Sequence, residues 1–199
     1  MTKHDRAEPL PPDDRRRAIV DAVIPLLLER GSTVTSREMA EAAGIAEGTI
    51  FRVFPDKASV IAGAIKASMD PAPVQDALAH VPEDIPMEAQ LEKAARVLLD
   101  WSGRVGTLFG VLRTVHPPTT GRPSGGRRIF RESNAAILAA LTDLFERHRD
   151  RLRVAPSRAA VAFRGLVFAS AHPMSDEKLT AEEIVAMLLT GIAISDVQD

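Results

Sequence analysis

Apolar residues recur at helical spacing along most of the chain, and no segment shows the strict apolar–polar alternation of a strand. The first segment runs from Asp13, which suits a helix N-cap, to Gly31, which suits the position just past a helix end. Its apolar members fall on one side of a helix: Ile19, Val23, Leu26 and Leu27. Pro25 removes one main-chain hydrogen bond and can kink the segment. We nevertheless expect a helix that ends before Gly31.

A short second helix is expected directly after this one. Thr35 or Ser36 suits its N-cap, and Glu38 stands where a capping box with Thr35 requires a carboxylate. Gly44 follows the last apolar position, so this helix has only about two turns.

The remaining pattern completes an all-α protein. Pro55 ends the third helix, and Asp56 suits the N-cap of the fourth. The expected helices after the second are 46–54, 56–69, 87–102, 104–115, 127–152, 157–171 and 180–194. Four prolines predict a connector at 70–86 with at most one helical turn, and the segment 116–126 (HPPTTGRPSGG) predicts a loop. We expect a flexible arm at 1–12, a first helical domain at 13–70 and a second at 71–199.

Composition narrows the environment and leaves the partner open. The chain has 199 residues, 45% of them hydrophobic, and no cysteine, so a disulfide framework is excluded. Its polar N-terminus lacks the apolar core of a signal peptide, and its longest apolar runs are too short for a bilayer. These features predict a cytoplasmic protein with no membrane partner. The first 70 residues hold 10 Lys/Arg against 11 Asp/Glu, so bulk charge does not indicate a nucleic acid partner.

Catalytic and metal-binding patterns are missing from the sequence. There is no GxSxG, P-loop or HExxH motif and no acidic metal cluster. No two of the five histidines share a metal-ligand spacing on one helix: His4, His80, His116, His148 and His172. We therefore expect no enzyme activity, no cofactor and no metal.

One stretch, AEAAGIAEGTIFRVFPDK at 40–57, carries the functional information. Two short helices joined by Gly44 and Ile45 fit a helix-turn-helix, in which small residues such as Ala40 and Ala43 permit a close crossing. Gly44 can take the left-handed conformation of the turn. The predicted inward side chains are Met39, Ile50 and Phe54, which join Ile19, Val23 and Leu27. The outward face of the third helix is the one that enters the DNA major groove in this motif.

In the order of its parts, this stretch resembles the DNA-binding domain of TetR-family transcriptional regulators. The parts are AEAAGI, GT, an aromatic three residues before Phe54, then Pro55 and Lys57, and they are preceded by a long helix ending in ERG. The resemblance covers about residues 13–69. The rest of the chain is similar to the family only in size and helical character.

The resemblance implies a role for particular residues. Hydroxyl or main-chain groups of Thr35, Ser36 and Thr49, with the Lys57 ammonium, would contact DNA phosphates. Ala46, Glu47 and Gly48 would lie closest to base edges. Arg37 and Arg52 are the candidate readers of guanine. Phe51 stands where the family usually has a tyrosine whose hydroxyl bonds a phosphate, and Phe51 can still pack on sugar or a thymine methyl.

For the second domain, the resemblance implies ligand binding and dimerisation. The two C-terminal apolar helices can bury one stripe inside the subunit and another against a second copy of the chain. The expected dimer residues are Phe163, Gly165, Leu166, Ile184, Leu188 and Gly191. The expected ligand-binding residues are Trp101, Phe109, Leu112, Arg113, Phe130, Asn134, Phe168 and His172. Each of these aromatics can equally be plain core.

The resulting hypothesis is a ligand-responsive repressor. It would bind a palindromic operator in double-stranded DNA as a homodimer and be released by a small apolar or amphipathic effector of unknown identity. Two alternatives stay open at this point. One is an orphan DNA-binding regulator without a small-molecule ligand, controlled by a protein partner, and the other is an all-helical enzyme.

Overall fold

The computed structural model describes residues 11–115, 124–171 and 177–192, and within them it contains helices and no strand. The expected all-α class is therefore confirmed. Most of the expected arm at 1–12 and most of the expected loop at 116–126 lie outside these ranges. His172, an expected ligand-binding residue, also lies outside them.

The chain divides into two compact units. The first holds residues 11–67 together with 108–115, and the second holds 68–107, 124–171 and 177–192. The division near residue 67 lies close to the boundary expected at 70. The end of one long helix, from residue 108 onward, also belongs to the first unit, which the sequence pattern did not suggest.

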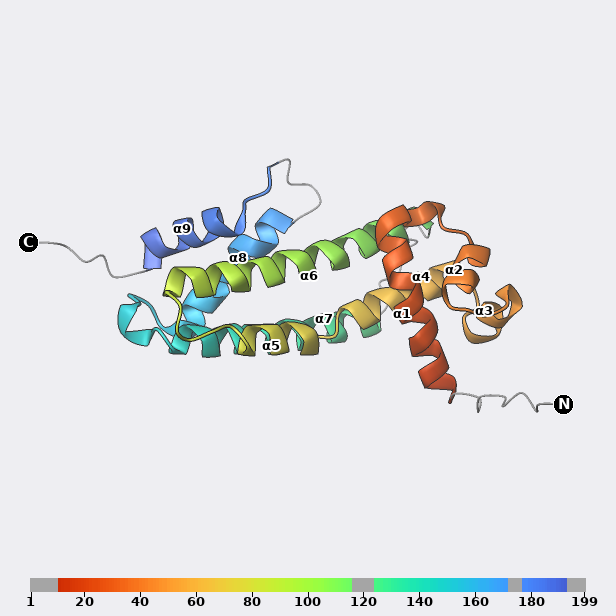
Figure 1. Cartoon of the computed structure of the whole chain (residues 1–199), viewed down its shortest axis with the longest axis horizontal. Coiled ribbons are helices and arrows are strands. Elements are labelled where there is room, and N and C mark those ends of the chain that lie inside the picture. The colour runs from red at the N-terminus through yellow and green to blue at the C-terminus, as the bar shows by residue number, and fades with distance from the viewer. Residues whose placement is uncertain (1–10, 116–123, 172–176, 193–199) are drawn as a thin grey trace, which may run out of the picture. The chain divides into compact units, whose positions relative to one another are not determined.

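The first unit contains α1 (Pro12–Arg30), a 3₁₀ turn at Gly31–Thr33, α2 (Ser36–Ala42), α3 (Glu47–Val53) and most of α4 (Lys57–Ser68). Figure 1 shows α2 and α3 beside α1, and α1 contacts both. The apolar faces of these helices form one core, made of Ile19, Val20, Val23, Leu27, Met39, Ile50, Phe54, Val60, Ile61 and Ala64. The expected inward residues of the helix-turn-helix are all among them.

Helix α1 begins one residue before its expected cap. Pro12 is its first residue and Asp13 lies in the first turn, where proline loses no hydrogen bond and a carboxylate interacts favourably with the helix dipole. Pro25 is accommodated inside the helix, and Gly31 caps its end at φ 62°.

The second unit contains α5 (Ala72–Ala79), most of α6 (Met87–Val115), α7 (Ser124–Glu146), a 3₁₀ turn at Arg149–Arg151, α8 (Pro156–Ala171) and α9 (Ala181–Ile192). Helix α7 packs on α5 and α8, and α8 packs on α9. At the centre, the Phe145 and Phe163 rings meet edge to face at 5.8 Å.

Three segments differ clearly from the sequence-based expectation. The segment 70–86 contains the two-turn helix α5, and the helices expected at 87–102 and 104–115 are one continuous helix α6. Helix α7 was expected at 127–152, but it begins at Ser124, inside the expected loop, and ends at Glu146. In α5, Pro71 and Pro73 stand at the N-cap and in the first turn, where proline is compatible with a helix.

Candidate nucleic-acid interface

The turn between α2 and α3 has the geometry that the sequence predicts. Gly44 adopts φ 65°, in the left-handed region that favours glycine. Its N–H donates to the Glu41 carbonyl at 3.1 Å, and the Ile45 N–H donates to the Ala40 carbonyl at 3.0 Å. These bonds close α2, and the chain enters α3 after Ala46.

Helix α3 presents one face to solvent and one to the core. Ile50 is buried at its centre, and Phe54 is buried directly after its end. The exposed positions are Ala46, Glu47, Gly48, Phe51 and Arg52, and Thr49 is half-buried. Phe51 is 48% exposed, a large apolar surface for one side chain. All the residues of this helix expected to face DNA are therefore at least partly accessible.

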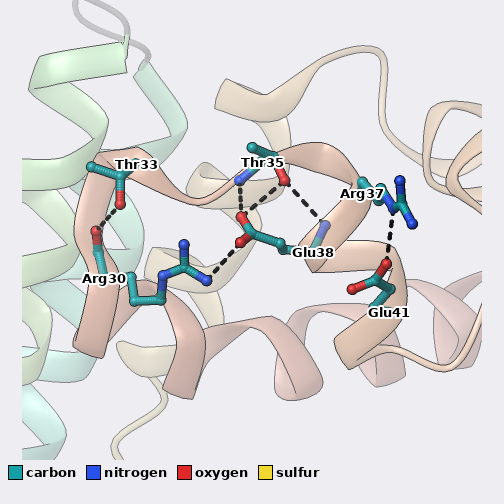
Figure 2. Close-up of polar contacts among 6 residues, drawn as sticks. All are labelled: Arg30, Thr33, Thr35, Arg37, Glu38 and Glu41. Carbon is teal, nitrogen blue, oxygen red and sulfur yellow. Dashed lines mark hydrogen bonds and ion pairs between the residues drawn. The ribbon is translucent and has the colours of Figure 1, made fainter.

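The start of α2 is closed by the expected capping box (Figure 2). Thr35 is the N-cap, and its hydroxyl oxygen accepts from the Glu38 N–H at 3.2 Å. The Thr35 N–H and hydroxyl both lie within hydrogen-bond distance of Glu38 Oε2, at 2.8 and 2.9 Å. The capping box therefore uses both donors of Thr35, which the resemblance assigned to a phosphate contact.

Glu38 is also held from α1, as Figure 2 shows. Arg30 Nη1 donates to Glu38 Oε1 at 2.6 Å. The hydrogen bonds from Thr35, followed by the one from Arg30, lower the pKa of Glu38 from 4.5 to about 2. Glu38 therefore stays ionised at neutral pH and ties the end of α1 to the start of α2.

Two further α2 residues remain accessible. Ser36 is half-buried at the first position of the helix, and its hydroxyl makes no hydrogen bond to a described residue. Arg37 pairs with Glu41 one turn later, at 3.0 Å between Nε and Oε1, and both side chains are mostly exposed (Figure 2). Exposed pairs of this kind are weak, so Arg37 can exchange Glu41 for another acceptor.

Lys57 links two parts of the first unit. Its Nζ donates to the Ser32 carbonyl at 2.7 Å, in the 3₁₀ turn between α1 and α2. The side chain is half-buried at the start of α4, and Asp56 caps that helix by accepting from the Ser59 N–H at 2.7 Å. An ammonium has three donors, so two stay available for an anion while Lys57 holds the turn.

Arg16 of α1 was not among the expected site residues, and it contacts the end of α3. Its Nη2 donates to the Val53 carbonyl at 2.7 Å, and its guanidinium carbon lies 4.8 Å from the centre of the Phe54 ring. The sequence shows only a basic run at 15–17, which gives no hint of which arginine reaches across.

A family model supplies the decisive comparison. Residues 19–64 match the model described as "Bacterial regulatory proteins, tetR family", and this range holds α2, the turn and α3. Residues 19–64 therefore form a TetR-family DNA-binding domain. The resemblance noted from the sequence is thereby confirmed for this domain, which contains the helix-turn-helix.

Solved structures agree on the fold. A regulator attributed to the TetR family from Mesorhizobium loti MAFF303099 is 17% identical, with a TM-score of 0.62, and the match covers 94% of this chain and 100% of that one. The TetR transcriptional regulator SCO0520 from Streptomyces coelicolor is 22% identical, with a TM-score of 0.58 over 90% and 99% of the two chains. SmeT, solved as a complex with triclosan, is 17% identical, with a TM-score of 0.57 over 94% and 95%. No curated protein sequence matches the chain.

The expected ligand-binding residues fall into two separate units of the structure. Phe109, Leu112 and Arg113 belong to the first unit, whereas Trp101, Phe130, Asn134 and Phe168 belong to the second. Within the second unit, Trp101 and Phe168 meet edge to face at 6.1 Å, and Phe130 is 48% exposed. Among the described members of this set, no other two side chains make an aromatic contact.

Polar groups near this aromatic pair were missed by the sequence analysis. The guanidinium of Arg164 lies 5.5 Å from the centre of the Phe168 ring, and its Nε is buried without an acceptor among the described residues. Burial lowers the pKa of Arg164. The hydroxyls of Ser102 and Ser133 are also buried in the second unit without a described partner. A charge inside an otherwise apolar helix pattern was the available signal for Arg164.

The expected dimer residues divide between core and surface. Phe163, Ile184 and Leu188 are buried inside the second unit, and Leu166 is half-buried. Gly165 and Gly191 are exposed. The first three therefore stabilise the subunit itself, since their side chains do not reach the surface.

The described residues hold neither a metal-ligand cluster nor a membrane-spanning helix. Within residues 11–115, 124–171 and 177–192, no three acidic or histidine side chains come together as metal ligands. No helix in the same ranges is long and apolar enough to cross a membrane.

Proposed function

We propose that this protein is a TetR-family repressor that binds a palindromic operator as a homodimer and is released by a small amphipathic effector. The observation that carries the proposal is the exposed face of α3, which begins at Ala46 and ends with Arg52 and is backed by the buried Ile50. A helix presented in this way on a helix-turn-helix can enter the major groove.

Within the groove, the roles follow from side-chain chemistry. Arg52 has the fork of donors that suits guanine. Gly48 has no side chain, and nothing lies within 4 Å of the position that an added methyl group would take, so the helix can approach base edges closely here. Ser36 and Lys57 have donors available for phosphates. Thr35 acts indirectly, by capping the helix that carries Ser36.

Dimerisation would use the exposed faces of α8 and α9. Val161 is 44% exposed and Met187 is 54% exposed, and Gly165 and Gly191 stand on the same two helices. Glycine costs roughly 1 kcal/mol relative to alanine inside a helix, and neither glycine has a neighbour that a methyl group would meet. A close approach by a helix of a second copy would explain both glycines, and a two-fold dimer would present two α3 helices to a palindrome.

The effector would bind in the second unit. Its aromatic pair, Trp101 and Phe168, offers an apolar surface, and the Nε of Arg164, which has no acceptor among the described residues, offers a donor. Apolar sites with a few placed polar groups are typical of small-molecule binding. The fold is shared with SmeT, which has been solved as a complex with triclosan. These observations favour an amphipathic effector.

Release would require that the effector bind one state of the protein better than the other. Helices α4 and α6 each run from one unit into the other, so a shift in either helix can be transmitted along the chain. Repression relieved by the effector is the outcome we expect.

The test is fluorescence anisotropy with duplex DNA selected by the full-length protein from a random-sequence library. We expect specific binding that weakens with salt. Lys57→Ala should reduce the slope of log affinity against log salt concentration by about one, the value for one phosphate contact. Lys66→Ala removes the same charge from the exposed end of α4 and serves as the matched control.

The same assay tests the effector. Selected DNA that is released by members of a library of small amphipathic compounds supports the proposal. DNA that stays bound throughout the library would favour the orphan regulator controlled by a protein partner. A selection that recovers no sequence would contradict the proposed operator binding.

A further inference from the structure

The basic run at the start of α1 does not act as one surface. Arg17 lies near Asp21 of its own helix, at 3.9 Å between Nε and Oδ2, and its side chain is 73% exposed. Arg16, one position earlier, crosses to a residue 37 positions away in sequence and donates to the Val53 carbonyl at 2.7 Å. Adjacent arginines therefore have different partners, and of these two only Arg16 contacts α3.

The group that Arg16 binds is one that α3 cannot satisfy alone. The last carbonyls of a helix have no partner within it. In α3, the Phe54 N–H satisfies the Ile50 carbonyl at 2.8 Å. The Val53 carbonyl, at the final residue, receives the guanidinium instead. A cation at this end is also favourable for the helix dipole.

A ring contact fixes the same guanidinium in a second direction. Its carbon lies 4.8 Å from the centre of the Phe54 ring, within the range of a cation–π contact. Phe54 is itself 2% exposed, and a methyl group on Gly63 would come within 3.3 Å of it. The planar guanidinium thus bridges the helix end and a ring that is held tightly by the core.

We infer that Arg16 is a positioning residue for DNA reading: it sets the orientation of α3 through Val53 and Phe54 and does not act as a phosphate contact. The inference rests on the proposed function of α3 in the major groove. A seven-residue helix has few contacts of its own, so loss of a tie at its end lets the reading face move. Binding then weakens, and discrimination between bases falls with it.

Charge and shape separate this role from a phosphate contact. A phosphate contact depends on one positive charge, which lysine keeps. The tie to Val53 and Phe54 needs the planar fork, which can donate and stack together, and lysine lacks it. Arg16→Lys and Arg16→Gln should therefore behave alike if Arg16 positions α3, and differently if it neutralises a phosphate.

The experiment uses the full-length chain and a duplex selected by the wild-type protein from a random-sequence library. Affinity is measured by anisotropy over a salt series, on that duplex and on its single-base variants. We expect both Arg16 variants to bind about tenfold more weakly, with an unchanged salt slope and a smaller penalty for mismatched bases. Arg17→Gln, which removes an equal charge one residue away, should match the wild type.

Hydrogen–deuterium exchange supplies a readout without DNA. We expect faster exchange at the α3 amides in both Arg16 variants, with thermal unfolding midpoints close to the wild type, because Arg16 is exposed and outside the core. Wild-type exchange in α3 would overturn the inference, as would Arg16→Lys binding normally while Arg16→Gln loses one unit of salt slope. If the wild type selects no DNA, the proposed function fails, and exchange still tests the tie.

Discussion

At the scale of single residues, Glu38 joins two helices of the DNA-binding unit. Its carboxylate accepts hydrogen bonds from Thr35 and Arg30, which brings its pKa to about 2. It therefore connects α1 to α2 only while it is ionised. The residue that the sequence marks as a capping partner is also an acid-sensitive link between two helices.

This link predicts a specific dependence of stability on pH. The folded pKa of Glu38, about 2, lies below its ordinary value of 4.5, so its contribution is fully present above 4.5 and is lost as the pH falls toward 2. In Glu38→Gln, stability should fall less steeply over that interval. Denaturant unfolding measured between pH 2 and 6 checks this.

Glu41→Gln is the control, since it removes a carboxylate from the same helix outside the capping box. An identical pH profile in Glu38→Gln and the wild type would show that the ionised Glu38 carboxylate does not contribute to the free energy of unfolding.

Gly63 gives a second prediction at this scale. A methyl group on it would lie 3.0 Å from Val20 Cγ2 and 3.3 Å from Phe54 Cε1. Alanine gains roughly 1 kcal/mol of helix propensity, but such crowding in a packed core costs about 1–3 kcal/mol. We expect Gly63→Ala to lower the free energy of unfolding by about 1 kcal/mol. Gly103→Ala, which meets nothing within 4 Å, should raise it by a similar amount.

At the scale of elements, α3 combines a fixed inner side with an accessible outer side. Phe51 is 48% exposed, and it stands at the position where the family resemblance implies a tyrosine hydroxyl that bonds a DNA phosphate. Phe51→Tyr should tighten binding to selected DNA about fivefold, since one added hydrogen bond is worth about 1 kcal/mol. The change is measured by anisotropy.

Phe130→Tyr adds the same hydroxyl to a phenylalanine that is equally exposed in the second unit. It should leave affinity for DNA unchanged. Equal affinity for Phe51→Tyr and the wild type would argue against a backbone contact at this position.

Apart from the start of α1, the helix boundaries of the first unit could be predicted from the sequence because each has a chemical cause. The capping box at Thr35, the left-handed Gly44 and the cap at Asp56 all appear where the residues require them. Periodicity and capping are local, so the sequence alone contains them.

The errors occurred where packing decides the outcome. The expected break in α6 falls at Gly103, but one helical glycine costs only roughly 1 kcal/mol. The buried face on both sides outweighs that cost, with Leu98, Trp101, Val105 and Leu108 in the core. Similarly, the prolines of α5 stand at its start, and Val74 and Leu78 bury the rest.

The candidate site was predictable to a similar depth. The face of α3 follows from periodicity, whereas the tie from Arg16 to Val53 spans 37 residues and depends on how α1 crosses α3. The same holds for Lys57, whose contact with Ser32 adds a structural duty to the expected phosphate contact. Long-range hydrogen bonds leave no spacing pattern in a sequence.

At the scale of the whole molecule, the proposed dimer gives a prediction with opposite signs. If α8 meets a second copy at Gly165, Gly165→Ala should weaken dimerisation several-fold, because the added methyl group separates the helices. If the face is solvated, alanine should instead stabilise the chain by roughly 1 kcal/mol. Sedimentation over a concentration series, combined with thermal unfolding, distinguishes the two.

Gly103→Ala controls for helix propensity, since Gly103 is exposed in the middle of α6 and open around its methyl position. It should leave the dimer unchanged. A Gly165→Ala protein that is more stable and equally dimeric would place the interface elsewhere.

The bond from Arg16 to the Val53 carbonyl has a consequence for how easily DNA preference could change. It is made to the main chain, so it does not depend on the identity of any side chain on the outer face of α3. Glu47, Gly48 and Arg52 can therefore be exchanged without disturbing the tie that holds the helix. Combinatorial libraries at these three positions should yield folded proteins with new target sequences, so the helix-turn-helix could be redirected to other DNA sites.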